Sequence, residues 1–117
     1  MTIDIENNII YHVDENFNKR EHKPISSKFD KIEILDNGNV LIIENYNNFN
    51  NKNVSNLYYL NRKIEIEWHI PYPNNDFNDR YVGFSVIGEK IFANTFNGFR
   101  VEIDIINFKL KKILFTK

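Results

Sequence analysis

Apolar and polar residues alternate along much of this chain in short runs, the pattern of half-buried β-strands. At residues 56–71 the sequence NLYYLNRKIEIEWHIP keeps this alternation on both sides of a turn at residues 61–63. Because a period of two directs successive side chains to opposite faces, the segment predicts a β-hairpin. Its apolar face would carry Tyr58, Leu60, Ile64, Ile66 and Trp68.

The same hairpin pattern occurs three times. Residues 10–17 align with residues 57–64, and both align with residues 100–108 when one inserted residue is allowed. Equivalent positions are 47 residues apart from Val13 to Leu60 and 43 residues apart from Leu60 to Ile103. A period of about 40–50 residues is typical of four-stranded propeller blades.

The segments between these hairpins supply further strands. Asn37-Gly38 favours a tight primed turn between two apolar runs, and Gly88 separates a second pair of runs within residues 81–96. No stretch shows a sustained helical period. The sequence therefore predicts one all-β domain of about ten antiparallel strands. We expect a half blade at residues 8–23, one four-stranded blade at 29–70 and another at 80–116.

Residues 56–68 and 94–104 resemble the blades of quinoprotein-type propellers, which combine a glycine turn, an apolar-aromatic-small-Leu-Asp run and a strand with a tryptophan. Two and a half blades cannot close a ring of four to eight, so we expect no central channel and no quinone cofactor. The sheets would form an open arc or a stack. In a stack, the apolar face of the 56–71 hairpin would meet Val101, Ile103, Phe108 and Leu110.

An unclosed sheet exposes edges that must be protected from pairing with other chains. Lys109, Lys111 and Lys112 fall on the last predicted strand, and the first hairpin is similarly charged at residues 19–23. Charged side chains are common guards of exposed edges, and Pro24 removes a ladder donor where the first hairpin ends. We therefore expect these two strands to be edges.

Composition narrows the class of protein. A chain of 117 residues is long enough to fold as one domain without a metal or disulfide, and it contains no cysteine. Acidic residues near the amino terminus and the lack of a long apolar run predict a cytoplasmic protein. The net charge of −1 does not favour direct nucleic-acid binding, and no membrane partner is expected.

Catalytic patterns are missing from the sequence. His12, His22 and His69 lack metal-ligand spacing, and the four glycines form no phosphate-binding loop. No serine has a nucleophile-elbow context. We therefore predict a protein that is not an enzyme and that uses no metal and no cofactor.

Two loops are the candidates for binding a partner. The segment 71–81 combines prolines, acids and aromatic residues, and the segment 46–53 is rich in asparagine. Tyrosine and asparagine are adaptable contact residues, but the same aromatic side chains could instead cap the core. The predicted partner-binding residues in these loops are Tyr46, Phe49, Tyr72, Asn74, Asp76, Phe77, Asp79 and Arg80.

A small, cysteine-free, Asn- and Ile-rich β protein resembles the bacterial immunity proteins of contact-dependent growth-inhibition systems. The resemblance implies a protein, monomeric when free, that binds one toxin domain, expected to be a nuclease, and covers its active site. Asp36, Glu44, Asp76 and Asp79 would then replace nucleic-acid phosphates in the toxin's basic cleft. Two alternatives stay open: a self-associating β scaffold, and a lectin-like binder using Tyr58, Trp68 and Tyr72.

Overall fold

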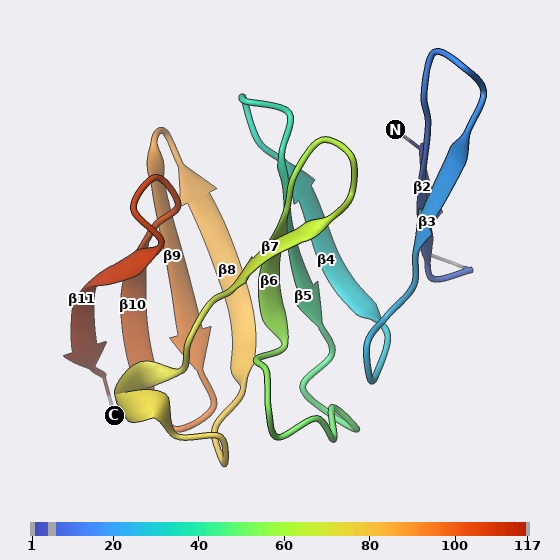
Figure 1. Cartoon of the computed structure of the whole chain (residues 1–117). Coiled ribbons are helices and arrows are strands. Elements are labelled where there is room, and N and C mark those ends of the chain that lie inside the picture. Colours follow the sequence, from blue (N-terminus) through green and yellow to red (C-terminus); the bar gives the residue numbers. More distant parts are fainter. Residues whose placement is uncertain (1, 5–6, 117) are drawn as a thin grey trace.

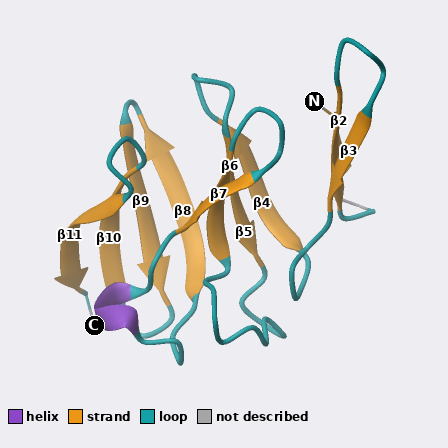
Figure 2. Ribbon diagram, in the orientation of Figure 1, coloured by secondary structure: helices purple, strands orange, loops and turns teal. Residues whose placement is uncertain are grey.

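The computed structural model describes residues 2–4 and 7–116 and is built from three antiparallel sheets (Figures 1 and 2). The first sheet contains β1 (Thr2–Asp4), β2 (Ile9–Val13) and β3 (Lys19–His22). The second contains β4 (Phe29–Ile34), β5 (Val40–Glu44), β6 (Leu57–Leu60) and β7 (Ile66–His69). The third contains β8 (Tyr81–Ile87), β9 (Lys90–Thr95), β10 (Phe99–Asp104) and β11 (Lys109–Phe115), and a 3-10 turn, η1 (Pro73–Asn75), precedes it.

The prediction of an all-β fold with unclosed sheets is confirmed. Strand order follows chain order in every sheet, so each sheet is a simple meander. The first sheet has one strand more than the predicted half blade, because Thr2–Asp4 pairs with Ile9–Tyr11. The two strands that were predicted to be charged edges, β3 and β11, do lie at the edges of their sheets.

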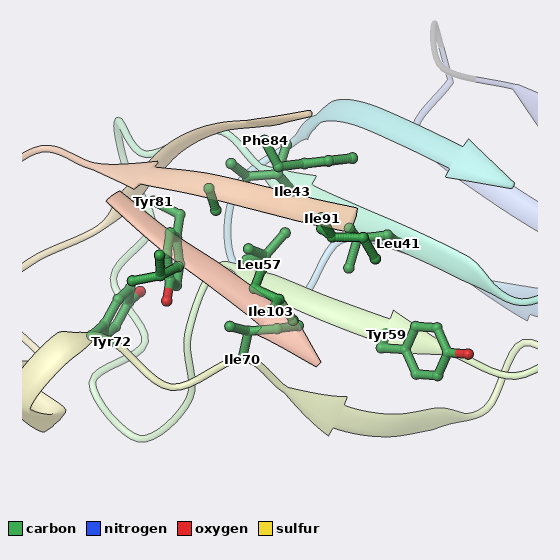
Figure 3. Packing of buried hydrophobic residues seen from close by; sticks show 12 residues of the cluster. Leu41, Ile43, Leu57, Tyr59, Ile70, Tyr72, Tyr81, Phe84, Ile91 and Ile103 are labelled. Carbon is green, nitrogen blue, oxygen red and sulfur yellow. The ribbon is translucent and has the colours of Figure 1, made fainter. Parts of the chain in front are cut away.

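The middle sheet is buried on both faces. All residues of β5 and β6 are buried, and their side chains alternate between two separate apolar clusters. Leu41, Ile43, Leu57 and Tyr59 pack with the third sheet, in the cluster of Figure 3. Val40, Ile42, Tyr58, Leu60 and Ile64 belong to the cluster that contains Ile10 of the first sheet. The three sheets therefore form a stack, with the middle sheet shared.

This arrangement corrects the predicted packing of the middle hairpin. Tyr58, Leu60 and Ile64 belong to the cluster of the first sheet, whereas the sequence interpretation directed them to the third. Trp68 does reach the third sheet, as predicted, and its ring stacks on Phe108 with centroids 5.4 Å apart. Ile66 remains 42% exposed. Trp68 therefore lies on the opposite face from Tyr58, Leu60 and Ile64, because the pairing of β6 with β7 shifts register between Tyr59 and Leu60. The single apolar face predicted for this hairpin is divided between the two clusters.

The face of the last sheet opposite the core carries charged side chains together with the exposed Ile87 and Leu114. The register places Arg100 beside Asn94, and Glu102 beside Phe92 and Lys112. Lys111 contacts the Glu102 carboxylate at 3.5 Å, and the Arg100 guanidinium lies 4.6 Å from the centre of the Phe92 ring. The inner face of the same sheet carries Val101 and Ile103, which belong to the core.

The sequence repeat corresponds to a repeated turn. Asp14, Asn61 and Asp104 each follow a central strand, and each side chain accepts backbone N–H groups from within its turn. Phe17, Ile64 and Phe108 close the three turns with φ angles of 63°, 57° and 54°. This left-handed conformation is unusual for bulky residues. Its recurrence at equivalent positions shows that the three hairpins share one backbone design.

Candidate functional site

The two predicted binding loops lie at the same end of the sheets. The loop between β5 and β6 and the loop between β7 and β8 both lie at the lower end in Figure 1. Arg80 joins them: its Nε and Nη2 donate to the Phe49 carbonyl at 3.1 and 3.0 Å, and its Nη1 donates to the Phe77 carbonyl at 2.7 Å. The guanidinium also lies over the rings of Phe49 and Tyr72. One cation therefore holds both loops in place.

Asp79 connects this assembly to a third loop. Its Oδ1 accepts the backbone N–H of Arg80 at 2.8 Å and that of Asn97 at 3.0 Å. Asn97 lies between β9 and β10, and the neighbouring Phe96 N–H donates to the Arg80 carbonyl at 2.9 Å. Because Asp79 is 1% exposed, it acts as an internal support and is not available as a surface acid.

Two predicted contact residues in these loops are also internal. Phe49 and Tyr72 are 3% and 1% exposed. The Tyr72 hydroxyl donates to Asn56 Oδ1 and accepts the Asn56 backbone N–H, both at 3.1 Å. Burial raises the pKa of Tyr72. The side chains of Phe49 and Tyr72 are therefore buried at the end of the core, which was the alternative to partner binding.

Asn56 is one of two residues at this end that sequence reasoning missed. It is fully buried, and its Nδ2 donates to the Glu44 and Tyr81 carbonyls at 2.8 Å each. Its Oδ1 accepts the Tyr81 N–H at 2.9 Å. The amide therefore connects the middle sheet with β8 at the start of the third. Among twenty asparagines in the sequence, no local signal distinguishes it.

The exposed groups at this end form what we call the loop-end surface. It contains an aromatic pair, Tyr46 and Phe96, with ring centroids 6.0 Å apart and exposures of 38% and 60%. Asparagines flank both members of this pair in sequence and recur in the loop before β8. The surface comprises Tyr46, Asn47, Asn48, Asn74, Asn75, Asn78 and Phe96, with Asp76, Phe77 and Arg80 partly exposed. Phe96 was missed because it lies next to an Asn-Gly turn.

Glu44 lies inside the molecule, contrary to its prediction as a surface acid. Its two carboxylate oxygens accept the backbone N–H groups of Ile25, Ser26 and Ser27 at 2.7, 3.0 and 3.0 Å. The Tyr58 hydroxyl donates to Oε2 at 2.6 Å. These bonds fix the segment that joins the first sheet to the second. Asp36 is exposed, but it lies in the β4–β5 turn at the opposite end from the loop-end surface.

Two histidines surround the Tyr58 ring. His22 Nε2 lies 2.7 Å from the Tyr58 hydroxyl, and the His69 ring centroid lies 5.2 Å from that of Tyr58. Burial lowers the pKa of both histidines, and the Glu44 carboxylate partly opposes this. Burial, with the adjacent Glu44 charge, raises the pKa of Tyr58. Tyr58 and Glu44 in this cluster are fully buried, whereas His22 and His69 are half-buried.

Among residues 2–4 and 7–116, no group of three or more histidine and carboxylate side chains is placed to hold a metal. Within the same ranges, no helix has the length and apolar character needed to cross a bilayer. An open hollow beside the loop-end surface is lined by Ser27, Lys28, Asn45, Asn47 and Asn48. Its lining is polar and open to solvent, unlike the enclosed, mostly apolar pockets that hold small molecules.

Comparison with protein-family models, curated proteins and solved structures found no match to this chain.

Proposed function

We propose that this protein binds another protein through the loop-end surface and performs no catalysis. The observation that carries the proposal is the exposed Tyr46–Phe96 pair, mounted on loops that Arg80 and Asp79 hold together. Aromatic side chains with few rotamers provide large contact areas at low entropic cost, and neighbouring asparagines adapt their hydrogen bonds to a partner. Rigid support lowers the ordering cost of binding further.

The resemblance to immunity proteins suggests the class of partner. In this proposal the protein acts in the cytoplasm, where it covers the active site of a nuclease toxin domain. Burial of Glu44 and Asp79 removes two of the four acids that would imitate phosphates, and Asp36 lies at the other end. Asp76 alone of the four remains partly exposed on the loop-end surface. Affinity would therefore depend more on the aromatic pair than on charge.

The first experiment is co-expression with a toxin domain encoded beside this gene. We expect growth to be restored and the two purified proteins to form a complex. Tyr46→Ala and Phe96→Ala should each weaken that complex roughly tenfold or more, because central aromatic contacts dominate interface energies. Cell death despite co-expression, together with no association in vitro, would reject the proposal.

Ile87→Ala provides a matched control. Ile87 is 61% exposed, close to the 60% of Phe96, but it ends β8 at the opposite end of the sheets from the loop-end surface. We expect this variant to retain full affinity. A second comparison separates the two ends of the sheets: Asp76→Lys should weaken binding and change its salt dependence, whereas Asp36→Lys should not. The reverse result would move the interface to the β4–β5 end.

A further inference from the structure

Each later sheet in the stack covers the sheet before it with an equivalent set of apolar residues. On β10, Val101 and Ile103 face the middle sheet, and Phe108 from the following turn contacts Tyr59 and Trp68. On β6, Tyr58 and Leu60 belong to the cluster of the first sheet, with Ile64 from the equivalent turn. Of the left-handed turn residues, Ile64 is thus buried between the first and middle sheets, and Phe108 packs on the middle sheet.

The equivalent residues of the first sheet have no such cover in the described chain. Ile10 points into the cluster with the middle sheet, so strand alternation turns Tyr11 and Val13 to the opposite side. By the same repeat, Phe17 belongs to that side. Val13 is 48% exposed and Phe17 is 87% exposed. We call Ile9, Tyr11, Val13, Phe17, Lys19 and Glu21 the outward face.

The two ends of the stack are therefore different. At the third sheet, Arg100 and Glu102 occupy the positions that Leu57 and Tyr59 hold in the middle sheet. Lys90 and Lys112 share that face, and the exposed apolar side chains there are Ile87 and Leu114. Stacked repeats need polar terminal faces for solubility, and the third sheet is the more charged of the two ends. The outward face has four apolar residues and only two charged ones. A head-to-tail contact would place Phe17 against Arg100, Glu102 and lysines, which is poor complementarity.

We propose that the outward face is covered by the outward face of a second copy of this chain, in a two-fold symmetric dimer. The face carries both charge signs beside its apolar stripe: Lys19 pairs in register with Val13, and Glu21 with Tyr11. Lys19 and Glu21 contact each other at 3.2 Å within one chain. A two-fold axis brings Lys19 of each copy near Glu21 of the other, and such an isologous contact closes without further growth.

The test measures mass in solution as a function of concentration. Sedimentation of the 117-residue chain up to roughly 1 mM should show the mass rising from 14.0 kDa toward twice that value. Val13→Asp and Phe17→Asp should each shift the dissociation midpoint roughly tenfold or more toward higher concentration. Ile106→Asp is the matched control, because Ile106 is 86% exposed in the equivalent turn of the third sheet. That variant should dimerise as the parent chain does.

Phe17→Asn separates the interface from the fold. Asparagine tolerates the left-handed conformation at this position better than phenylalanine, so the variant should fold at least as stably while losing the dimer. A parent chain that stays monomeric throughout the concentration series would overturn the proposal. So would a dimer that Phe17→Asn and Val13→Asp leave intact, or one that Ile106→Asp dissociates. The result is independent of whether the loop-end surface binds a toxin.

Discussion

The Tyr58 hydroxyl donates a hydrogen bond of 2.6 Å to Glu44 Oε2 while both side chains are fully buried. Because the hydroxyl proton is directed to Glu44, His22 Nε2 at 2.7 Å must act as the donor to the hydroxyl oxygen. The chain of contacts runs from the middle sheet to β3 of the first. It joins the two sheets within the apolar cluster that contains Ile10 and Tyr58.

Glu44→Gln should destabilise the protein by roughly 3 kcal/mol, because an amide nitrogen would face backbone or hydroxyl donors that now bond to a carboxylate. Tyr58→Phe should lower the free energy of unfolding by about 1–2 kcal/mol through loss of the hydroxyl. Urea unfolding measures both. Glu33→Gln is the control: its carboxylate is partly exposed and lies 3.9 Å from Lys31, so we expect a change within about 0.5 kcal/mol. Equal effects at Glu33 and Glu44 would contradict the assigned role of Glu44.

Stability should decrease as the pH falls below the ordinary histidine pKa of 6.5. Burial lowers the pKa of His22 and His69 in the folded state, so between 6.5 and their folded pKa values the unfolded chain binds more protons. The stabilisation is complete above 6.5 and is lost progressively below it. Thermal unfolding between pH 7.5 and 5 measures the slope. His22→Gln should flatten it, whereas a slope unchanged in that variant would refute the linkage.

Arg80→Lys should loosen the loop-end surface. Lysine cannot reproduce the planar set of donors that reaches the Phe49 and Phe77 carbonyls together. We expect a loss of about 1–2 kcal/mol and a melting temperature lower by roughly 4–8 °C. Arg62→Lys is the control, because Arg62 makes an exposed bond to the Asn37 carbonyl. Comparable losses in the two variants would show that Arg80 has no special role in the loops.

The two equivalent turn positions, Phe17 and Ile64, should respond to glycine in opposite directions. Phe17→Gly removes the strain of a left-handed phenylalanine that is 87% exposed, so stability should rise by about 1 kcal/mol. Ile64→Gly relieves the same strain but empties a site that is 6% exposed, so stability should fall by roughly 2 kcal/mol. Chemical denaturation of both variants decides. Changes of the same sign would contradict the different burial of the two turns.

Local chemistry allowed the sequence to predict the strands and their repetition. Alternation around Tyr58 and Leu60 placed both on one face, and Asn37-Gly38 marked the position of the β4–β5 turn. The predicted primed turn type is wrong, because Gly38 has a positive φ and Asn37 does not. The repeat also predicted that Val13, Leu60 and Ile103 occupy equivalent strand positions, and each lies in a central strand before a left-handed turn. These features depend on neighbours a few residues away, so the local sequence is enough to predict them.

The candidate site was predicted only in part. The sequence placed binding residues in two loops, and the structure brings those loops together through Arg80. The sequence could not reveal that Phe49, Tyr72 and Asp79 are buried, or that Phe96 from a third loop lies beside Tyr46. Exposure of a loop side chain depends on which distant segments pack against it.

By itself, the sequence determined an all-β chain of three related hairpins, because strand period and turn conformation are set by adjacent residues. Only the tertiary structure decided that the middle sheet is covered on both faces and that Glu44 is internal. Glu44 follows an apolar run and resembles a solvated strand end, yet its carboxylate is matched by amide groups 17 to 19 residues earlier in the chain. Burial of a charge is stable only when such partners converge, and convergence is a property of the folded chain.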